Sequence, residues 1–93
     1  MKVKDLLSSH HRWTRKTFAR NNKGQNVDYC DEHAARFCLL GGIGRVYKTG
    51  TEIEAVKKKV WSYLRSLELC SISDFNDSSD FNAVKKLVDD LDI

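Results

Sequence analysis

The segment from Ala35 to Val46, ARFCLLGGIGRV, constrains the fold of this chain more than any other stretch. It is almost continuously apolar and carries three glycines, so it belongs inside the protein. We predict a central helix that begins near Asp28–Asp31, where acidic side chains favour the positive end of a helix dipole. Glycines lower helix propensity, but they either let the backbone of another element come close or end the helix early. The segment is therefore expected to be a packing scaffold.

Three further helices are predicted from caps and periodicity. The first spans Val3–Ser9, and Trp13 just after it is expected to anchor it to the core. Thr51-Glu52-Ile53-Glu54 has the form of a capping box, and the apolar stripe that follows it is typical of an amphipathic helix. Asp80 is a suitable N-cap for a last helix whose apolar face runs from Val84 to Leu91.

The connections between these helices are polar. Within residues 14–28, Asn21-Asn22-Lys23-Gly24 tolerates the positive φ of tight turns, so we predict a small β-hairpin or an extended loop there. Residues 71–79 are predicted to be a polar connection. The fold class is thus mainly α (α+β), with about four helices and a small β-hairpin between the first and second, in a single domain of residues 1–93. The expected core residues are Trp13, Cys38, Leu39, Val60, Trp61, Leu64, Val84 and Leu87.

Composition favours a folded intracellular protein. Apolar residues make up 41% and charged residues 31% of the chain, which is a globular balance. No apolar run reaches the roughly 18–20 residues that span a bilayer, and the N-terminus lacks the apolar stretch of a signal peptide. Three cysteines, an odd number, fit a reducing compartment. We therefore expect a cytoplasmic protein without a membrane partner.

The charge is spread unevenly along the chain. Residues 1–50 carry ten basic and four acidic side chains, whereas residues 51–93 carry six and nine. Such asymmetry marks an anionic partner for the front half, unless folding brings the halves together so that their charges partly cancel. We favour cancellation.

Several short motifs follow one another in a definite order. They are Trp13-Thr14, Ala19-Arg20, Gly24, Phe37-Cys38-Leu39 with Gly41, and Asn76-Asp77. In this order they resemble an uncharacterised family of small bacterial and phage proteins, known only as a domain of unknown function. Phe37 stands where that family has tryptophan, and Gly42 where it has alanine. The resemblance implies the fold outline above and carries no activity with it.

A metal site is the first chemistry to weigh, because Cys30, His33, Cys38 and Cys70 are ligand types. In a helix, Cys30 and Cys38 would lie about 12 Å apart at ~1.5 Å per residue. One zinc ion with bonds of about 2.3 Å cannot contact both. The objection softens if the helix begins after Cys30. We interpret Cys38 as a small buried hydrophobe and His33 as exposed.

The sequence signals for phosphate binding and for catalysis are also weak. Gly42–Thr49 nearly matches the phosphate-loop pattern, but Tyr47 replaces the glycine that lets such a loop wrap phosphates. Cys70 with His10 or His11 would supply a nucleophile and a base, yet nothing favours that pairing. The acids Asp74, Asp77 and Asp80 lack the glycine and the closing glutamate of a calcium loop, so turn and cap roles explain them better. We expect no catalytic residue, metal or cofactor, and no enzyme.

Binding functions remain, and the basic front half is the place to seek them. The candidate partner-binding residues are Arg12, Arg15, Lys16, Arg20 and Lys23. We predict a small non-enzymatic domain that binds another protein, and the resemblance to phage proteins suggests an inhibitor or modulator of a host system. The alternative is nucleic-acid binding by segment 12–23, in which basic side chains meet phosphates and Trp13 or Phe18 stacks on a base.

Overall fold

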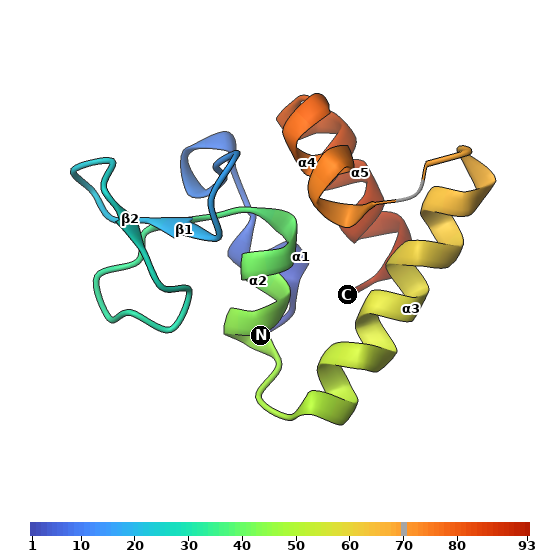
Figure 1. The fold of residues 1–93 in the computed structure, drawn as a ribbon, viewed down its shortest axis with the longest axis horizontal. Helices are drawn as coiled ribbons and strands as arrows, with labels where there is room; N and C mark the ends of the chain where they lie inside the picture. Colours follow the sequence, from blue (N-terminus) through green and yellow to red (C-terminus); the bar gives the residue numbers. More distant parts are fainter. Residues whose placement is uncertain (70) are drawn as a thin grey trace.

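The computed structural model describes residues 1–69 and 71–93, and it is built mainly from α-helices (Figure 1). The elements of the described residues are α1 Val3–Leu6, the 3-10 helix η1 His10–Arg12, β1 Ala19–Arg20, β2 Asn26–Val27, β3 Arg36–Phe37, α2 Leu39–Val46, α3 Gly50–Ser66, α4 Ile72–Ser78 and α5 Phe81–Leu91. The predicted mainly α class is confirmed, with a hairpin between α1 and α2. The molecule measures 36 × 28 × 19 Å, with the hairpin at one end and α3 at the other.

The three short strands form an antiparallel sheet in the order β2-β1-β3. Ala19 of β1 pairs with Val27 of the hairpin on one side and with Phe37 on the other. Gly24 has a φ of 79°, which suits the tight turn between β1 and β2. The third strand was not predicted from the sequence.

The central helix is shorter than expected, and the prediction that it begins near Asp28–Asp31 is wrong. The residues before Leu39 form turns and β3 instead. Asp28 Oδ1 accepts a hydrogen bond from the amide of Cys30 at 2.8 Å, and Asp31 Oδ1 accepts one from the amide of His33 at 2.7 Å. Such local bonds compete with helical ones, so these acids hold turns and do not start a helix.

The glycines of α2 permit close packing, as predicted. A Cβ atom on Gly41 would lie 2.0 Å from the carbonyl oxygen of Phe18. A Cβ atom on Gly44 would lie 2.7 Å from the ring of Tyr29. The polar front of the chain therefore packs directly against the backbone of α2, which only glycine allows at these positions.

Residues 71–79 are not the polar connection that we predicted, because α4 occupies most of them. Ser71 caps this helix, since its Oγ accepts a hydrogen bond from the amide of Asp74 at 3.2 Å. Ile72 and Phe75 are buried. Two apolar residues three apart suffice to seat one short helix, although they are too few to show a periodic pattern.

One buried amide, that of Asn76, joins α4 to the front of the molecule. The side chain is 1% exposed. Its Oδ1 accepts hydrogen bonds from Nε1 of Trp13 at 2.7 Å and from the amide of Leu39 at 2.9 Å. Its Nδ2 donates to the carbonyl of Thr14 at 3.1 Å. Because Leu39 opens α2, Asn76 satisfies one of the free amides at the start of that helix.

The sequence predicts caps for the two longest helices, α3 and α5, and the prediction is correct for α5 alone. Helix α3 is capped by Thr49, whose Oγ1 accepts a hydrogen bond from the amide of Glu52 at 3.1 Å, so the predicted box at Thr51 is wrong. For α5 the predicted cap is confirmed, because Asp80 Oδ1 accepts a hydrogen bond from the amide of Ala83 at 2.9 Å.

Most of the predicted core is confirmed. The predicted residues that are buried are Cys38, Leu39, Val60, Leu64, Val84 and Leu87. Trp13 is half-buried and packs against the edge of the core. Trp61 is 38% exposed, so its prediction is wrong. It lies about 100° around the helix from Val60, which takes the inward position.

The two ends of the chain meet beside this core. The amide of Lys4 donates to the carbonyl of Ile93 at 3.0 Å, and Ile93 is buried. Lys2 Nζ lies 2.7 Å from Asp92 Oδ2, and Lys4 binds the other oxygen of that carboxylate. Within the described ranges, no helix combines the length and apolarity needed to cross a bilayer.

Candidate functional site

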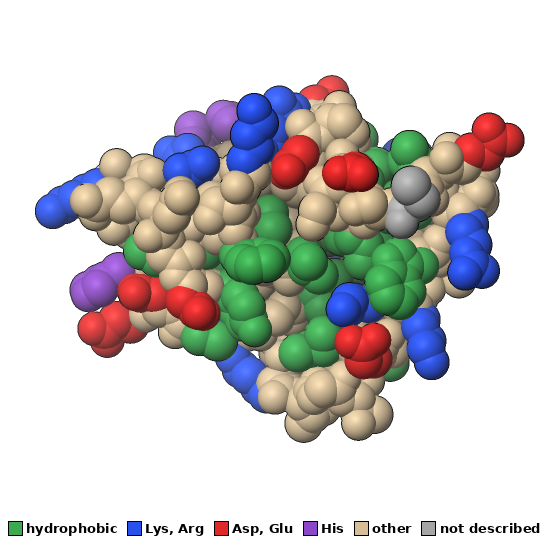
Figure 2. All heavy atoms as spheres, viewed as in Figure 1, with side chains coloured by type: hydrophobic (Ala, Val, Ile, Leu, Met, Phe, Trp, Pro, Cys, Tyr) green, Lys and Arg blue, Asp and Glu red, His purple; other side chains and the backbone are tan. Residues whose placement is uncertain are grey.

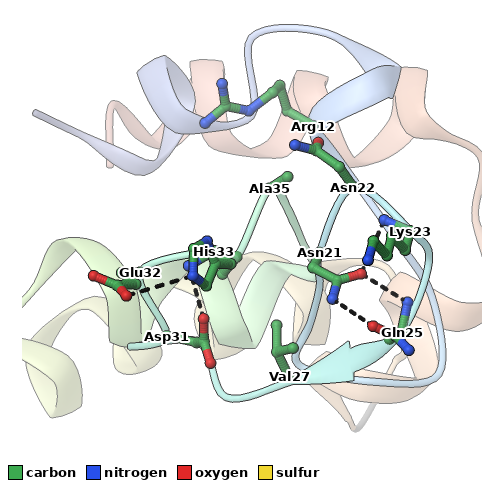
Figure 3. A pocket seen from close by; sticks show the side chains of 11 residues that line it. Arg12, Asn21, Asn22, Lys23, Gln25, Val27, Asp31, Glu32, His33 and Ala35 are labelled. Atoms are coloured by element: carbon green, nitrogen blue, oxygen red, sulfur yellow. Dashed lines mark hydrogen bonds and ion pairs between the residues drawn. The ribbon is translucent and has the colours of Figure 1, made fainter.

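An open groove of about 720 Å³ lies between η1, the hairpin turn and the loop before β3 (Figure 3). Its lining residues are Arg12, Asn21, Asn22, Lys23, Gln25, Val27, Asp31, Glu32, His33, Ala34 and Ala35. Pairing of β1 with β2 and β3 brings the hairpin turn and this loop to the same end of the molecule. The groove is thus a product of the sheet.

Its two turns are held by side chains that bond to the backbone. Asn21 Oδ1 accepts hydrogen bonds from the amides of Lys23 at 2.9 Å and Gln25 at 3.0 Å. Asn21 Nδ2 donates to Gln25 Oε1 at 2.9 Å. Across the groove, Asp31 Oδ1 is bonded to the amide of His33. These bonds fix the shape of both rims before any ligand arrives.

The rims carry opposite charges. Arg12 and Lys23 come from η1 and the hairpin turn, whereas Asp31 and Glu32 come from the facing loop, as Figure 3 shows. Among the residues that the structure describes, neither Arg12 nor Lys23 has an acidic side chain within ion-pair distance. Glu32 Oε1 lies 3.4 Å from His33 Nε2, and both side chains are exposed. Two cations without an acidic partner in the described residues therefore face half-buried Asp31 and exposed Glu32 across the groove.

The five predicted partner-binding residues do not form one patch. Only Arg12 and Lys23 line the groove. Arg20 is half-buried, and its guanidinium donates to Thr14 Oγ1 at 2.9 Å, to the carbonyl of Gly24 at 3.1 Å and to Asn26 Oδ1 at 2.8 Å. Arg20 thus has a structural role within the hairpin.

The remaining two basic residues lie beside α4 and α5. Arg15 donates to the carbonyl of Ser79, and its guanidinium carbon lies 5.0 Å from the centre of the Trp13 ring. The amide of Lys16 donates to Asp77 Oδ1 at 2.9 Å, and Lys16 has a φ of 66°. One face of the Trp13 ring lies under Arg15, its Nε1 is bonded to Asn76, and the Phe81 ring packs against it with centres 6.0 Å apart. These contacts use Trp13 within the fold and oppose its stacking on a base.

A second hollow of about 420 Å³ contains Cys38, Phe18 and Asn76 among its lining residues. Cys38 is the N-cap of α2, and its Sγ accepts a hydrogen bond from the amide of Gly41 at 3.2 Å. Burial raises the pKa of the Cys38 thiol, although the helix amides oppose the shift. Cys38 is therefore a neutral thiol near pH 7, unlike the thiolate that nucleophilic chemistry requires.

The other candidate sites from the sequence do not assemble among the described residues, beginning with the cysteines and histidine considered as metal ligands. The distance argument against a site at Cys30 and Cys38 assumed a helix that does not form; Cys30 is exposed and Cys38 is buried. Cys70 lies outside the described residues. Within residues 1–69 and 71–93, no three His, Cys, Asp or Glu side chains gather as metal ligands.

The near phosphate loop is not a loop, because the glycines of Gly42–Thr49 lie inside α2. The rings of His10 and His11 lie against each other on exposed η1, with their centres 3.9 Å apart and their planes tilted by 38°. Asp80 is a cap, as expected, because it accepts a hydrogen bond from the amide of Ala83. Asp77 instead accepts a hydrogen bond from the amide of Lys16, which is a long-range contact and not the turn or cap role that we predicted for it.

Comparisons with protein families, curated proteins and solved structures found no match for this chain. The resemblance to an uncharacterised family therefore stays a prediction. Four of the residues that carry it are joined by hydrogen bonds, because Asn76 binds Trp13, Thr14 and Leu39. Sequence reasoning missed the acidic rim of the groove, for which the only signal was a run of turn-forming acids.

Proposed function

We propose that this chain is a non-enzymatic interaction domain that binds another protein through the groove. The observation that carries this proposal is the opposite charge of the two rims, Arg12 and Lys23 against Asp31 and Glu32. A protein surface presents both signs of charge side by side and can match both rims. A nucleic-acid backbone presents only negative charge, which the acidic rim would repel.

The groove also has the rigidity that favours binding. Its turns are held by Asn21 and Asp31, so little conformational entropy is lost when a partner docks. Arginine is enriched among the residues that dominate binding energy, which makes Arg12 the expected anchor. Such a domain would inhibit or modulate its partner by occupying part of the partner's surface.

The test is comparative capture from a nuclease-treated cytoplasmic extract of cells in which the protein is made. The bait is the wild type, the groove variant Arg12→Glu/Lys23→Glu, or the control variant Lys59→Glu/Lys86→Glu, which has the same net charge as the groove variant. We expect a protein that is retained by the wild type and the control and lost from the groove variant. Equal retention by all three baits, or no retained protein, would contradict the proposal.

Nucleic-acid binding is the second candidate, and one observation favours it. Arg12 and Lys23 lie in the same groove as Asn22, and arginine and asparagine are the side chains that most often read base edges. Fluorescence anisotropy with a labelled strand and duplex of about 20 nucleotides would test it. Binding that falls steeply with salt and is lost in the groove variant supports this candidate. No binding by the wild type at about 0.05 M salt excludes it.

A further inference from the structure

A band of apolar side chains crosses the face of the molecule that Figure 2 shows, over α2 and α3. Two of its members are exposed, Phe18 at 52% and Trp61 at 38%. The apolar band consists of Phe18, Tyr29, Leu40, Tyr47 and Trp61. None of these residues lines the groove.

A ring contact links two members of the band, and the other three are placed by their positions on and beside α2 and α3. The rings of Phe18 and Tyr29 pack edge to face with centres 6.2 Å apart, and Tyr29 lies against Gly44 of α2. Leu40 and Tyr47 are half-buried and seven residues apart, so they share one side of this segment. Trp61 continues the band on α3, which contacts α2.

The two ends of the band differ in charge. The Phe18 end of the band carries two acids. Asp77 lines the hollow beside Phe18, and exposed Asp28 precedes Tyr29 in the chain. Lys16, which lines the same hollow, is a cation at this end. Figure 2 shows acidic side chains over α4 and over the loop that follows β2.

At the Trp61 end the charge is reversed. Lys57 Nζ lies 5.5 Å from the centre of the Trp61 ring. Lys58 and Arg65 are exposed and lie three residues before and four after Trp61, so they flank it on the same side of α3. Glu54 is the acid there, and it is paired with Lys57 at 3.3 Å.

We propose that the apolar band is the interface of a two-fold dimer of this chain. In such a dimer the Phe18 end of each copy faces the Trp61 end of the other. The aromatic side chains of the two ends then bury each other. The acids beside Phe18 of each copy face the cations beside Trp61 of the other, so the interface contains this contact two times. A uniformly charged partner would match only one end, so the reversal of charge along the band favours a second copy.

Sedimentation velocity of the full chain from about 1 to about 500 µM tests this proposal. We expect a dimer that dissociates on dilution and is weakened when salt is raised from about 0.05 to about 0.5 M. Trp61→Ala should raise the dissociation constant about tenfold or more. Leu67→Ala is the control, because Leu67 is a 51% exposed apolar side chain at the C-cap of the same helix and lies outside the band. A wild type that is monomeric throughout, or a dimer that Trp61→Ala leaves unchanged, overturns the proposal.

A charge exchange tests the two-fold geometry. Asp28→Lys alone and Lys58→Asp alone each place like charges opposite one another twice, so each sample should be mostly monomeric. An equimolar mixture of the two variants restores opposite charges at both contacts, and it should dimerise. Restoration supports the arrangement. If each variant dimerises like the wild type, or if the mixture stays monomeric while both melts remain cooperative, the arrangement is overturned.

Discussion

Removal of the Asn76 side chain should destabilise the protein more than any exposed substitution, because it binds three groups from two separate segments, residues 13–14 and Leu39. Asn76→Ala would leave the amide of Leu39, the carbonyl of Thr14 and Nε1 of Trp13 without their present partner. A buried polar group without a partner costs about 1–3 kcal/mol. Trp13 is half-buried, so water can replace its lost bond, and the other two groups give an expected loss of about 2–6 kcal/mol.

That loss is large against the total stability that a chain of this size has, roughly 5–14 kcal/mol. Urea unfolding followed by circular dichroism gives the free energy of unfolding for the wild type, Asn76→Ala and Asn82→Ala. Asn82 is exposed on α5, and alanine is the better helix former, so this control should be neutral or slightly stabilising. If Asn76→Ala loses no more than about 0.5 kcal/mol relative to the control, the role assigned to the amide is refuted.

Asn76→Asp separates the loss of the donor from the loss of the whole side chain. The introduced carboxyl keeps an acceptor for Trp13 and Leu39, but its second oxygen replaces the Nδ2 donor that faces the carbonyl of Thr14 and lies 3.2 Å from Asp77 Oδ1. Burial and repulsion raise its folded pKa above the unfolded value of about 3.9. The loss relative to the wild type should therefore be small below about pH 4 and grow as pH rises. A pH-independent loss would contradict this explanation.

Three further outcomes follow from the packing, the ion pairs and the cysteines. Gly41→Ala should cost more than about 2 kcal/mol in urea unfolding, because its Cβ would lie 2.0 Å from a backbone oxygen, whereas Gly50→Ala, with open space around it, should stabilise α3 slightly. Hydrogen bonds from two lysines lower the pKa of Asp92 to about 2, so its contribution is present above the unfolded value of 3.8 and lost as pH falls towards 2. The stability difference between the wild type and Asp92→Asn should shrink over that window. Iodoacetamide at about pH 8 should modify exposed Cys30 rapidly and Cys38 only after unfolding, as mass spectrometry of the peptides would show.

The sequence predicts the fold where local signals and burial agree. The cap at Asp80 is predicted correctly, and so is the amphipathic helix α3, because a cap and a period of 3.6 residues are local properties. The apolar stripe of α3 is correct only in part, since Val56, Val60 and Leu64 are buried whereas Trp61 and Leu67 are exposed. The start of α2 is misread, because Asp28 and Asp31 suit a helix start and a turn equally well. Only the pairing of β1 with β3, a contact between distant residues, decides between them.

The same limit applies to the candidate site. Arg12 and Lys23 are recognisable from the sequence as cations, but their exposure and their position across from Asp31 and Glu32 depend on the fold. Arg20 has the same side chain as Arg12, yet it bonds inside the hairpin. No local property of the sequence separates the arginine that binds the fold from the one that faces solvent.

Much of the positive charge of residues 1–50 is used within the fold, so the basic surface left for a partner is smaller than the sequence suggests. Lys2 and Lys4 pair with Asp92 of the back half, so part of the asymmetry cancels on folding as we predicted. Several arginines of the same half donate to backbone carbonyls, including that of Ser79. What remains in the groove is two cations that face two acids. Binding there should therefore depend on salt far less steeply than six or more phosphate contacts would, and a shallow salt dependence with a captured partner would separate protein recognition from nucleic-acid recognition.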